Sequence, residues 1–151
     1  MANILTAVAP DTAERVRRIL HGHNLHFVHH IDEAQNALDN EGIQLVFVGA
    51  RFDESRMFDL LDFIRLDAER KKIPIVAAIV GTTRMAKETI TGLAHTTKIF
   101  GASVFLNLND FTDDETANGR LRIIVDALIA PPDVIPTLRK TLSDPDGPRG
   151  R

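Results

Sequence analysis

Several residue types that carry chemistry in proteins are absent from this chain of 151 residues. It has no cysteine, which excludes disulfides, thiolate catalysis and cysteine-bound metal clusters. It has no tryptophan or tyrosine, so an aromatic stacking surface would depend on its eight phenylalanines. The formal net charge is -3 and the acidic and basic residues are interspersed, so the sequence offers no basic face for nucleic acid.

Long apolar segments are also missing. No run approaches the ~20 residues of a membrane span. The opening segment, MANILTAVAP, lacks the length and the charged start of a signal peptide. We therefore expect a cytoplasmic protein that makes no membrane contact. With 44% hydrophobic and 26% charged residues, the composition is that of a soluble domain able to bury a core.

Short apolar runs alternate with segments of helical periodicity over residues 1–130. Most of these runs are nearly continuous, which is typical of parallel strands covered on both faces. The predicted strands are Ile4–Ala9, Leu25–Val28, Ile43–Val48, Ile75–Val80 and Val104–Leu108. The second is the most polar, which suits an edge strand. With right-handed crossovers, the alternation predicts a doubly wound α/β domain with a parallel sheet.

Helix start signals lie between the predicted strands. The first helix is predicted to begin at Asp11, with Glu14 at capping-box spacing, the second near Asp32, and the fifth at Thr112, with Glu115 at the same spacing. Helical periodicity places the following residues toward the core: Ala13, Val16, Leu20, Ala34, Ala37, Leu38, Met57, Leu61, Ile64, Ala68, Ala86, Ile90, Leu93, Thr97, Leu121, Ile124, Val125 and Leu128.

The composition changes after Ala130. Five of the seven prolines lie in residues 131–151, PPDVIPTLRKTLSDPDGPRGR, so this segment buries little and is predicted to be an extension of the domain. Val134, Leu138 and Leu142 have helical spacing. We favour a loose tail with one turn packed back on the domain over a docking helix or the start of a linker.

Four segments together resemble the receiver domain of two-component response regulators. LVFVGARF, followed by a helix ending in DLLDFIR, resembles the third strand and third helix of that family. IPIV at residues 73–76 resembles the start of its fourth strand, GASVFL at residues 101–106 the lead through its fifth, and DEA at residues 32–34 the opening of its second helix. The resemblance covers roughly residues 3–130. It implies the flavodoxin-like strand order 2-1-3-4-5, with the site at the carboxyl ends of the strands.

The resemblance also implies which groups an active receiver carries at those ends. An acid pair after the first strand holds Mg²⁺, and an aspartate at the end of the third is the nucleophile for phosphoryl transfer. A hydroxyl after the fourth strand and a lysine at the end of the fifth contact the phosphate. This chain departs from the pattern at every position, where it has Val8, Ala9, Gly49, Ile79 and Leu108. The resemblance is therefore to a degenerate member, a pseudo-receiver without the usual phosphoacceptor.

Three acids survive near the expected site. Asp11, Asp53 and Asp110 could form a displaced metal site. We interpret Asp11 as a helix cap, Asp53 as a loop residue of a kind that active receivers also carry, and Asp110 as part of a turn. The sequence therefore predicts neither a metal nor a cofactor.

Two further motifs suggest ligands only weakly. A histidine cluster could bind a transition metal or titrate near neutrality, but its spacing fits no common ligand pattern, and we interpret its members as solvated: His21, His23, His26, His29 and His30. Residues 81–87, GTTRMAK, faintly resemble a phosphate loop but lack its second glycine and the hydroxyl after the lysine. We interpret them as the start of a helix.

These features together predict a signalling module that is not an enzyme and acts by contact with protein partners in a two-component pathway. In receivers the face formed by the fourth helix, fifth strand and fifth helix is the usual output and dimer surface. In this chain it would carry Arg84, Lys87, Phe105, Arg120 and Arg122, and a homodimer through it is one expected form. The alternative is a small-ligand or metal sensor, because Ala9, Gly49 and the Thr82–Thr83 pair leave room at the strand ends.

Overall fold

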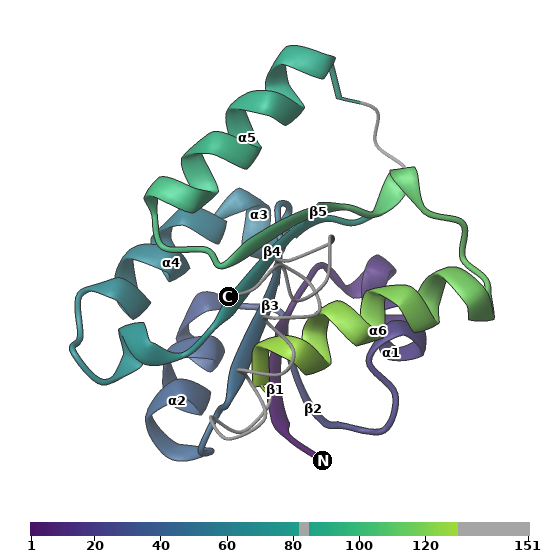
Figure 1. The fold of residues 1–151 in the computed structure, drawn as a ribbon. Helices are drawn as coiled ribbons and strands as arrows, with labels where there is room; N and C mark the ends of the chain where they lie inside the picture. Colours follow the sequence, from purple (N-terminus) through teal and green to yellow (C-terminus); the bar gives the residue numbers. More distant parts are fainter. Residues whose placement is uncertain (82–84, 130–151) are drawn as a thin grey trace, which may run out of the picture.

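A single parallel sheet organises the part of the chain that the computed structural model describes, residues 1–81 and 85–129. Its strand order is β2-β1-β3-β4-β5, as Figure 1 shows. The strands are β1 Asn3–Ala7, β2 Asn24–Val28, β3 Leu45–Gly49, β4 Ile75–Ile79 and β5 Val104–Asn107. This confirms the predicted fold class and the edge position of the second strand. The predicted extension, residues 131–151, lies outside the described residues.

Helices cover both faces of the sheet. α1 Ala13–Ile19 and α6 Glu115–Ile129 pack on one face, and α2 Ile31–Asn40, α4 Met57–Arg65 and α5 Lys87–Ile99 pack on the other. A single short turn, α3 Phe52–Ser55, precedes α4, and 3₁₀ turns lie at Pro10–Thr12, Arg70–Lys72 and Leu108–Asp110.

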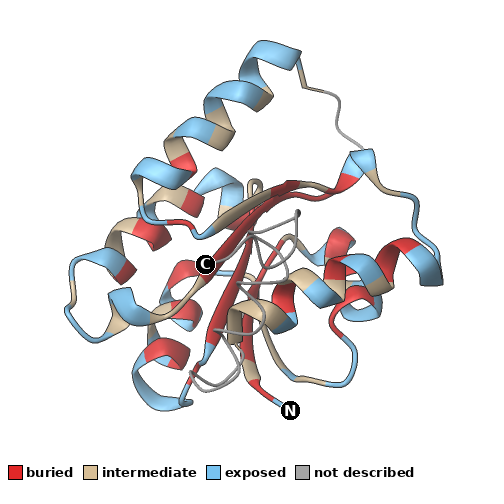
Figure 2. Cartoon of the chain, viewed as in Figure 1, coloured by how far each residue is buried: buried red, intermediate tan, exposed pale blue. Residues whose placement is uncertain are grey.

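The core has two layers because successive residues of a strand point to opposite faces. In β1, Leu5 and Ala7 face the α2 and α4 side, while Ile4 faces the α1 and α6 side. Every residue of β3 and β4 is buried, and Figure 2 shows the central strands as a continuous buried band. This is why those strands read as unbroken apolar runs in the sequence.

The predicted start of the first helix is wrong. The chain first makes the 3₁₀ turn Pro10–Thr12, and α1 begins at Ala13. Asp11 makes no side-chain cap in this turn, and its carboxylate accepts hydrogen bonds from Arg51 instead. The interpretation of Asp11 as a helix cap is therefore also wrong.

Two other helix predictions are corrected. α4 ends at Arg65, so Ala68 is exposed and lies beyond the helix. At the start of α6 the cap is Asp114, whose Oδ1 accepts the Ala117 N–H at 2.9 Å, and Thr112 donates its hydroxyl to Asp114. The helical spacing therefore extended about one turn too far at the end of α4, and the capping-box spacing selected the wrong cap for α6.

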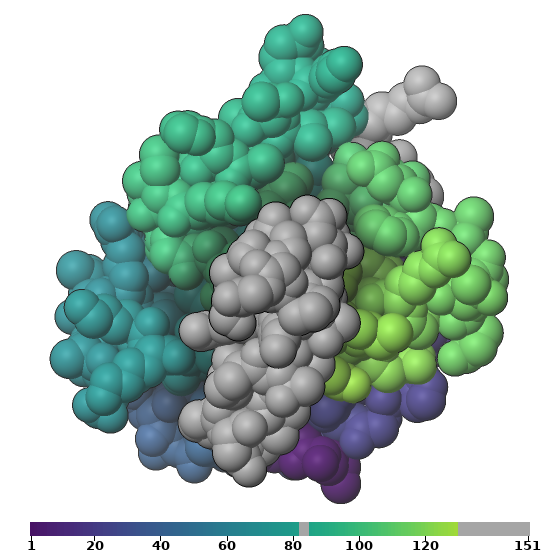
Figure 3. Space-filling model, in the orientation of Figure 1, coloured from purple at the N-terminus to yellow at the C-terminus, as the bar shows by residue number. Residues whose placement is uncertain are grey.

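Helix α5 packs loosely compared with the others. Of its residues only Thr97 is buried, and Ile90 and Leu93 are half-buried. Figures 1 and 3 show its amino-terminal part projecting from the body of the domain. Its sequence, KETITGLAHTTKI, is rich in β-branched residues and contains Gly92, which are poor helix formers.

Candidate functional site

The residues predicted at the degenerate pocket meet at one edge of the sheet. Val8 directly follows β1, Gly49 and Ile79 end β3 and β4, and Leu108 directly follows β5. All four are buried, and Ala9 beside them is half-buried. The parallel strands place their carboxyl ends together, so the fold assembles these positions as expected.

Apolar side chains fill the space above Gly49. A Cβ on this residue would lie 3.6 Å from Val8 Cγ1 and 3.8 Å from Val80 Cγ2, which is ordinary contact. Val8, Val80 and Leu108 belong to one buried apolar cluster. A charged group placed among them would lose its hydration, which is strongly unfavourable unless a hydrogen-bond or charge partner replaces it. None of these three side chains offers an oxygen ligand to Mg²⁺ or a hydrogen-bond donor to a phosphoryl group.

Arg51, which the sequence reasoning missed, lies across this edge. Its Nη2 donates to both carboxylate oxygens of Asp11, at 3.0 and 3.3 Å. The side chain is only 36% exposed, and its Nε is buried without a hydrogen-bond partner among the described residues. A charged pair therefore lies at this edge of the sheet, with Arg51 beside Gly81.

Two shallow hollows flank the Arg51–Asp11 pair. One, of about 270 Å³, is lined by Ala9, Pro10, His29, His30, Arg51, Asp53 and Glu54. The other, of about 280 Å³, is lined by Asp11, Thr12, Arg15, Val80, Gly81, Asn109 and Asp113. Both fall just below the range of roughly 300–1,000 Å³ for ordinary small-molecule pockets.

Asp53 lies in the connection after β3, as predicted, but it also caps α2. Its Oδ2 accepts the Ile31 N–H at 2.8 Å, and His30 Nδ1 lies 3.3 Å from its Oδ1. The hydrogen bond from the Ile31 backbone is the main cause that lowers the pKa of Asp53, so the carboxylate stays ionised. This carboxylate occupies the place at the amino end of α2 that favours an anion.

The turn that carries Asp53 has an unusual backbone. Asp53, Glu54 and Ser55 have φ of 45°, 56° and 71°, although none is a glycine. Such a conformation costs roughly 1–2 kcal/mol per residue for L-amino acids. The Arg56 N–H donates to the Phe52 carbonyl at 2.7 Å and closes the turn. The contacts of Asp53 with α2 offset this strain.

The acids and histidines do not assemble a metal centre in the described part of the chain. No group of three or more His, Asp or Glu side chains there is placed to hold an ion. Asp53 is committed to α2 and Asp11 to Arg51. Asp110 lies exposed in the 3₁₀ turn after β5.

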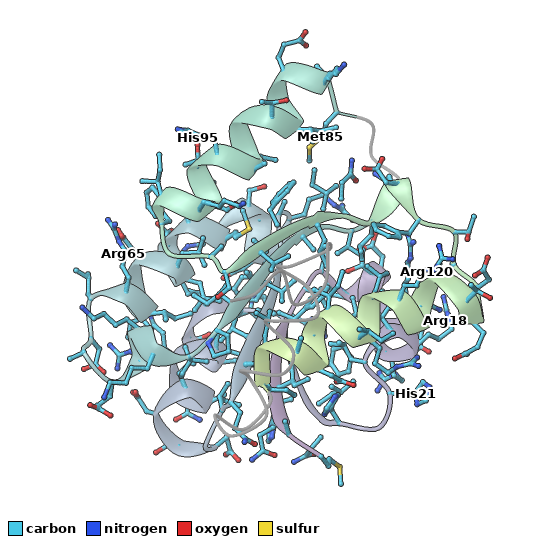
Figure 4. All side chains as sticks on the ribbon, in the orientation of Figure 1. Arg18, His21, Arg65, Met85, His95 and Arg120 are labelled. Carbon is cyan, nitrogen blue, oxygen red and sulfur yellow. The ribbon has the colours of Figure 1, made fainter. Side chains whose placement is uncertain are left out.

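The histidines form separate contacts. His23 accepts the Ala2 N–H at Nδ1, 3.1 Å away, and donates from Nε2 to Asp126 at 2.7 Å, joining the residue before β1 to α6. His29 donates from Nδ1 to the Val8 carbonyl at 3.0 Å. These two are half-buried structural residues, contrary to the expectation that the whole cluster is solvated. His21 is exposed after α1, as Figure 4 shows.

The described residues of the segment after β4, Gly81 and 85–87, do not form a phosphate loop. Gly81 has φ of 105°, and α5 begins at Lys87 with Ala86 as a cap that makes no side-chain hydrogen bond. Thr82, Thr83 and Arg84 lie outside the described residues. The room that Thr82 and Thr83 were expected to leave is therefore not described.

The predicted interaction surface is brought together only in part. Lys87 is exposed at the start of α5, Phe105 is half-buried in β5, and Arg120 is exposed on α6 (Figure 4). Arg122 points to α1, where it donates to the Ile19 and Arg18 carbonyls at 2.8 and 2.9 Å. The prediction that Arg122 belongs to the interaction surface is therefore wrong, because its side chain binds α1. Exposed Ile123 was missed.

Comparison with known proteins identifies the fold. No family model matches the chain, and no curated protein matches it. Among solved structures, a putative response regulator from Chloroflexus aurantiacus aligns with a TM-score of 0.68 at 16% identity, over 86% of this chain and 98% of that one. A response regulator from Hahella chejuensis aligns with a TM-score of 0.66 at 18% identity, over 86% and 96%.

A third similar structure is NtrX from Brucella abortus, in complex with ADP. It aligns with a TM-score of 0.62 at 25% identity over 95% of this chain but 30% of NtrX, so the chain spans less than a third of that protein. This protein therefore has the receiver fold of response regulators. No helix among the described residues is long and apolar enough to cross a membrane.

Proposed function

We propose that this protein is a receiver-fold signalling module that is not phosphorylated at the usual position and acts by contact with a protein partner. The observation that carries the proposal is the buried apolar filling at the strand ends. Val8, Gly49, Ile79 and Leu108 supply no nucleophile, metal ligand, hydroxyl or ammonium group. Phosphoryl transfer depends on such groups to attack, orient and neutralise the phosphoryl group.

The first part of the proposal is tested by mass. The full chain is incubated with a small-molecule phosphodonor and Mg²⁺, beside a receiver that retains its phosphoacceptor aspartate, and intact mass is recorded. We expect an adduct on the reference receiver and none on this chain. A stable phosphoryl adduct on Asp53 or any other acid would overturn the proposal.

The second part concerns the face formed by α5, β5 and α6. Lys87, Phe105 and Arg120 belong to these three elements, and α6 also carries Ile123, which is 67% exposed. Arg120 and Ile123 are neighbours on α6 because they are three residues apart, and interfaces are enriched in arginine and have apolar cores. The partner we propose is a protein, and a second copy of this chain is the simplest form.

Sedimentation velocity of the wild type and of Ile123→Asp tests the homodimer. A concentration-dependent dimer that Ile123→Asp abolishes supports it. The matched control is Leu66→Asp, which changes another exposed large apolar residue, just after α4. A monomer at all concentrations would exclude the homodimer and leave a different protein as the partner.

The alternative, a small-ligand or metal sensor, is favoured by one observation. The two hollows beside Arg51 lie at the carboxyl ends of the strands, where ligands bind in open parallel sheets. We rank this function second because the hollows are small and because Asp11 and Asp53 already bind Arg51 and the Ile31 N–H. Thermal-shift screening with nucleotides, flavins and divalent metals tests it, and no shift with any of them would eliminate it.

A further inference from the structure

β2 is an edge strand, and only one of its two sides is paired. Its neighbour in the sheet is β1, to which it runs parallel. The Asn24 N–H donates to the Ala2 carbonyl at 2.9 Å, so the backbone of Asn24 points toward β1. Because this direction alternates along a strand, the N–H and C=O groups of Leu25 and Phe27 point to the free side.

The open part of this edge is short and is bounded at both ends. The N–H and C=O groups of these two residues make no hydrogen bond among the residues that the structure describes. The outward N–H before them, on His23, donates to the Leu20 carbonyl at 3.3 Å. The outward N–H after them, on His29, donates to Glu33 Oε1 at 3.1 Å. The open segment is therefore symmetric about the residue between the two, His26.

This edge lacks the usual protection against pairing. Natural edge strands carry charged residues, prolines or bulges that keep other chains from adding a strand. Residues 24–28, NLHFV, contain no Asp, Glu, Lys, Arg or Pro, and they pair with β1 in register at every position, without a bulge. Only Val28 among them is buried. The strand therefore keeps the features that allow another strand to pair with it.

We propose that the β2 edge binds the same edge of a second copy of this chain, antiparallel, about a two-fold axis between the two His26 residues. In this register Leu25 lies opposite Phe27 of the second copy, and Phe27 lies opposite its Leu25. Each such pair exchanges two backbone hydrogen bonds, so every open N–H meets an open C=O. The two sheets then become one continuous sheet.

The side chains favour a second copy over an unrelated strand. Leu25 and Phe27 pack against the same apolar cluster, on the α1 and α6 side, and the Arg17 guanidinium lies 4.5 Å from the centre of the Phe27 ring. In the antiparallel pair, Leu25 of each copy therefore meets Phe27 of the other, an apolar cross-strand contact of the kind that stabilises paired strands. No Asp, Glu, Lys or Arg of the two strands meets across the axis.

The expected dimer is weak and depends on concentration, because a single pair of short strands buries little surface. β2 and β5 lie at opposite edges of the sheet. The proposed contact therefore does not use the face formed by α5, β5 and α6, and it does not rest on the proposed function.

Amide hydrogen exchange of the full chain, resolved by residue with NMR, tests the pairing. At a protein concentration of about 1 mM, we expect the Leu25 and Phe27 amides to exchange about tenfold more slowly than at about 0.05 mM. The amides of Asn24 and His26, which face β1, should exchange at the same rate at both concentrations. This alternation distinguishes pairing of the β2 edge from a general change in stability.

His26→Lys is the decisive variant, because it places like charges opposite each other across the axis. It should abolish the concentration dependence. The matched control is His21→Lys, which changes an exposed histidine in the turn after α1 and should keep it. If His26→Lys does not fold, Leu25→Pro replaces it, because proline there removes an outward N–H and no bond to β1.

Two results would overturn the proposal. One is exchange at Leu25 and Phe27 that does not change with concentration. Fast exchange would then show an open edge, and slow exchange would show an edge covered by this chain itself. The other is an equal loss of the concentration dependence in His21→Lys. Ile123→Asp should leave the slowing at Leu25 and Phe27 intact, so the outcome is separate from that of the homodimer through α6.

Discussion

Gly49→Asp places a carboxylate at the end of β3. It tests whether the apolar side chains around Gly49 disfavour a charged group. The Cβ contacts with Val8 and Val80, at 3.6 and 3.8 Å, are ordinary, so the substitution is not blocked sterically. Gly49→Ala is the matched control, because it adds the same Cβ without the charge. The difference between the two variants therefore isolates the carboxylate.

The expected difference in the free energy of unfolding between Gly49→Asp and Gly49→Ala follows from the linkage between protonation and folding. An aspartate in the unfolded chain has a pKa of about 3.9, and burial among apolar side chains raises the folded value. If the carboxyl group stays protonated up to pH 7, the penalty is about 3 pH units at 1.36 kcal/mol each, or about 4 kcal/mol. Because the folded pKa is the higher one, the penalty is absent below about pH 3.9 and grows as the pH rises.

Urea unfolding of the wild type and both variants at pH 4.5 and pH 7 measures the effect. We expect Gly49→Asp to be less stable than Gly49→Ala by about 1 kcal/mol at pH 4.5 and about 4 kcal/mol at pH 7. Gly49→Ala should lie close to the wild type. A difference below about 1 kcal/mol at pH 7, or one that does not change with pH, would refute the apolar pocket. It would mean that water or Arg51 reaches the carboxylate.

Four further outcomes are expected. Gly92→Ala, at a position in α5 where a Cβ meets no described atom within 4 Å, should raise the free energy of unfolding by about 1 kcal/mol in urea titration. Ser55→Gly should stabilise by about 1 kcal/mol because φ is 71°, whereas Ser55→Val should destabilise; equal effects would argue against the left-handed turn. Arg122→Leu removes the donor of two α1 carbonyls and should lower the free energy of unfolding by about 1–3 kcal/mol. A loss below about 0.5 kcal/mol, the size expected for a neutral surface substitution, would contradict the role of Arg122 in capping α1. Because the pKa of Asp53 is lowered in the folded state, its carboxylate stabilises the fold above about pH 3.9, and this stabilisation is lost as the pH falls through the folded pKa. The wild type should therefore lose more stability than Asp53→Asn on acidification. Parallel acid-unfolding curves of the two proteins would contradict this stabilising role of Asp53.

The sheet was predictable because burial on both faces leaves a direct trace in the sequence. The runs around Val46 and Ala77 are apolar at every position, and each became a central strand. The more polar run at Leu25–Val28 became an edge strand for the same reason. Helix ends were less predictable, because Thr112 and Asp114 are both good caps and only local geometry selects Asp114.

The pocket positions were predictable from their place at the ends of successive strands. What covers them was not, because it depends on side chains from loops that are distant in sequence. Arg51 meets Asp11 across 40 residues, and Asp53 meets Ile31 across 22. Arg122 reaches α1 from the far end of the domain sequence, 103 residues from Ile19. An arginine or aspartate in a loop gives no sequence signal for such a partner.

The central claim is that phosphorylation does not switch this receiver fold, so a phosphodonor should leave the face formed by α5, β5 and α6 unchanged. Hydrogen–deuterium exchange of the full chain, recorded with and without a phosphodonor and Mg²⁺, measures this most directly. We expect the same exchange in both conditions over β4, α5 and β5, whereas a receiver with its phosphoacceptor aspartate should change there. A reproducible change in exchange at α5 or Phe105 on adding the phosphodonor would contradict the claim.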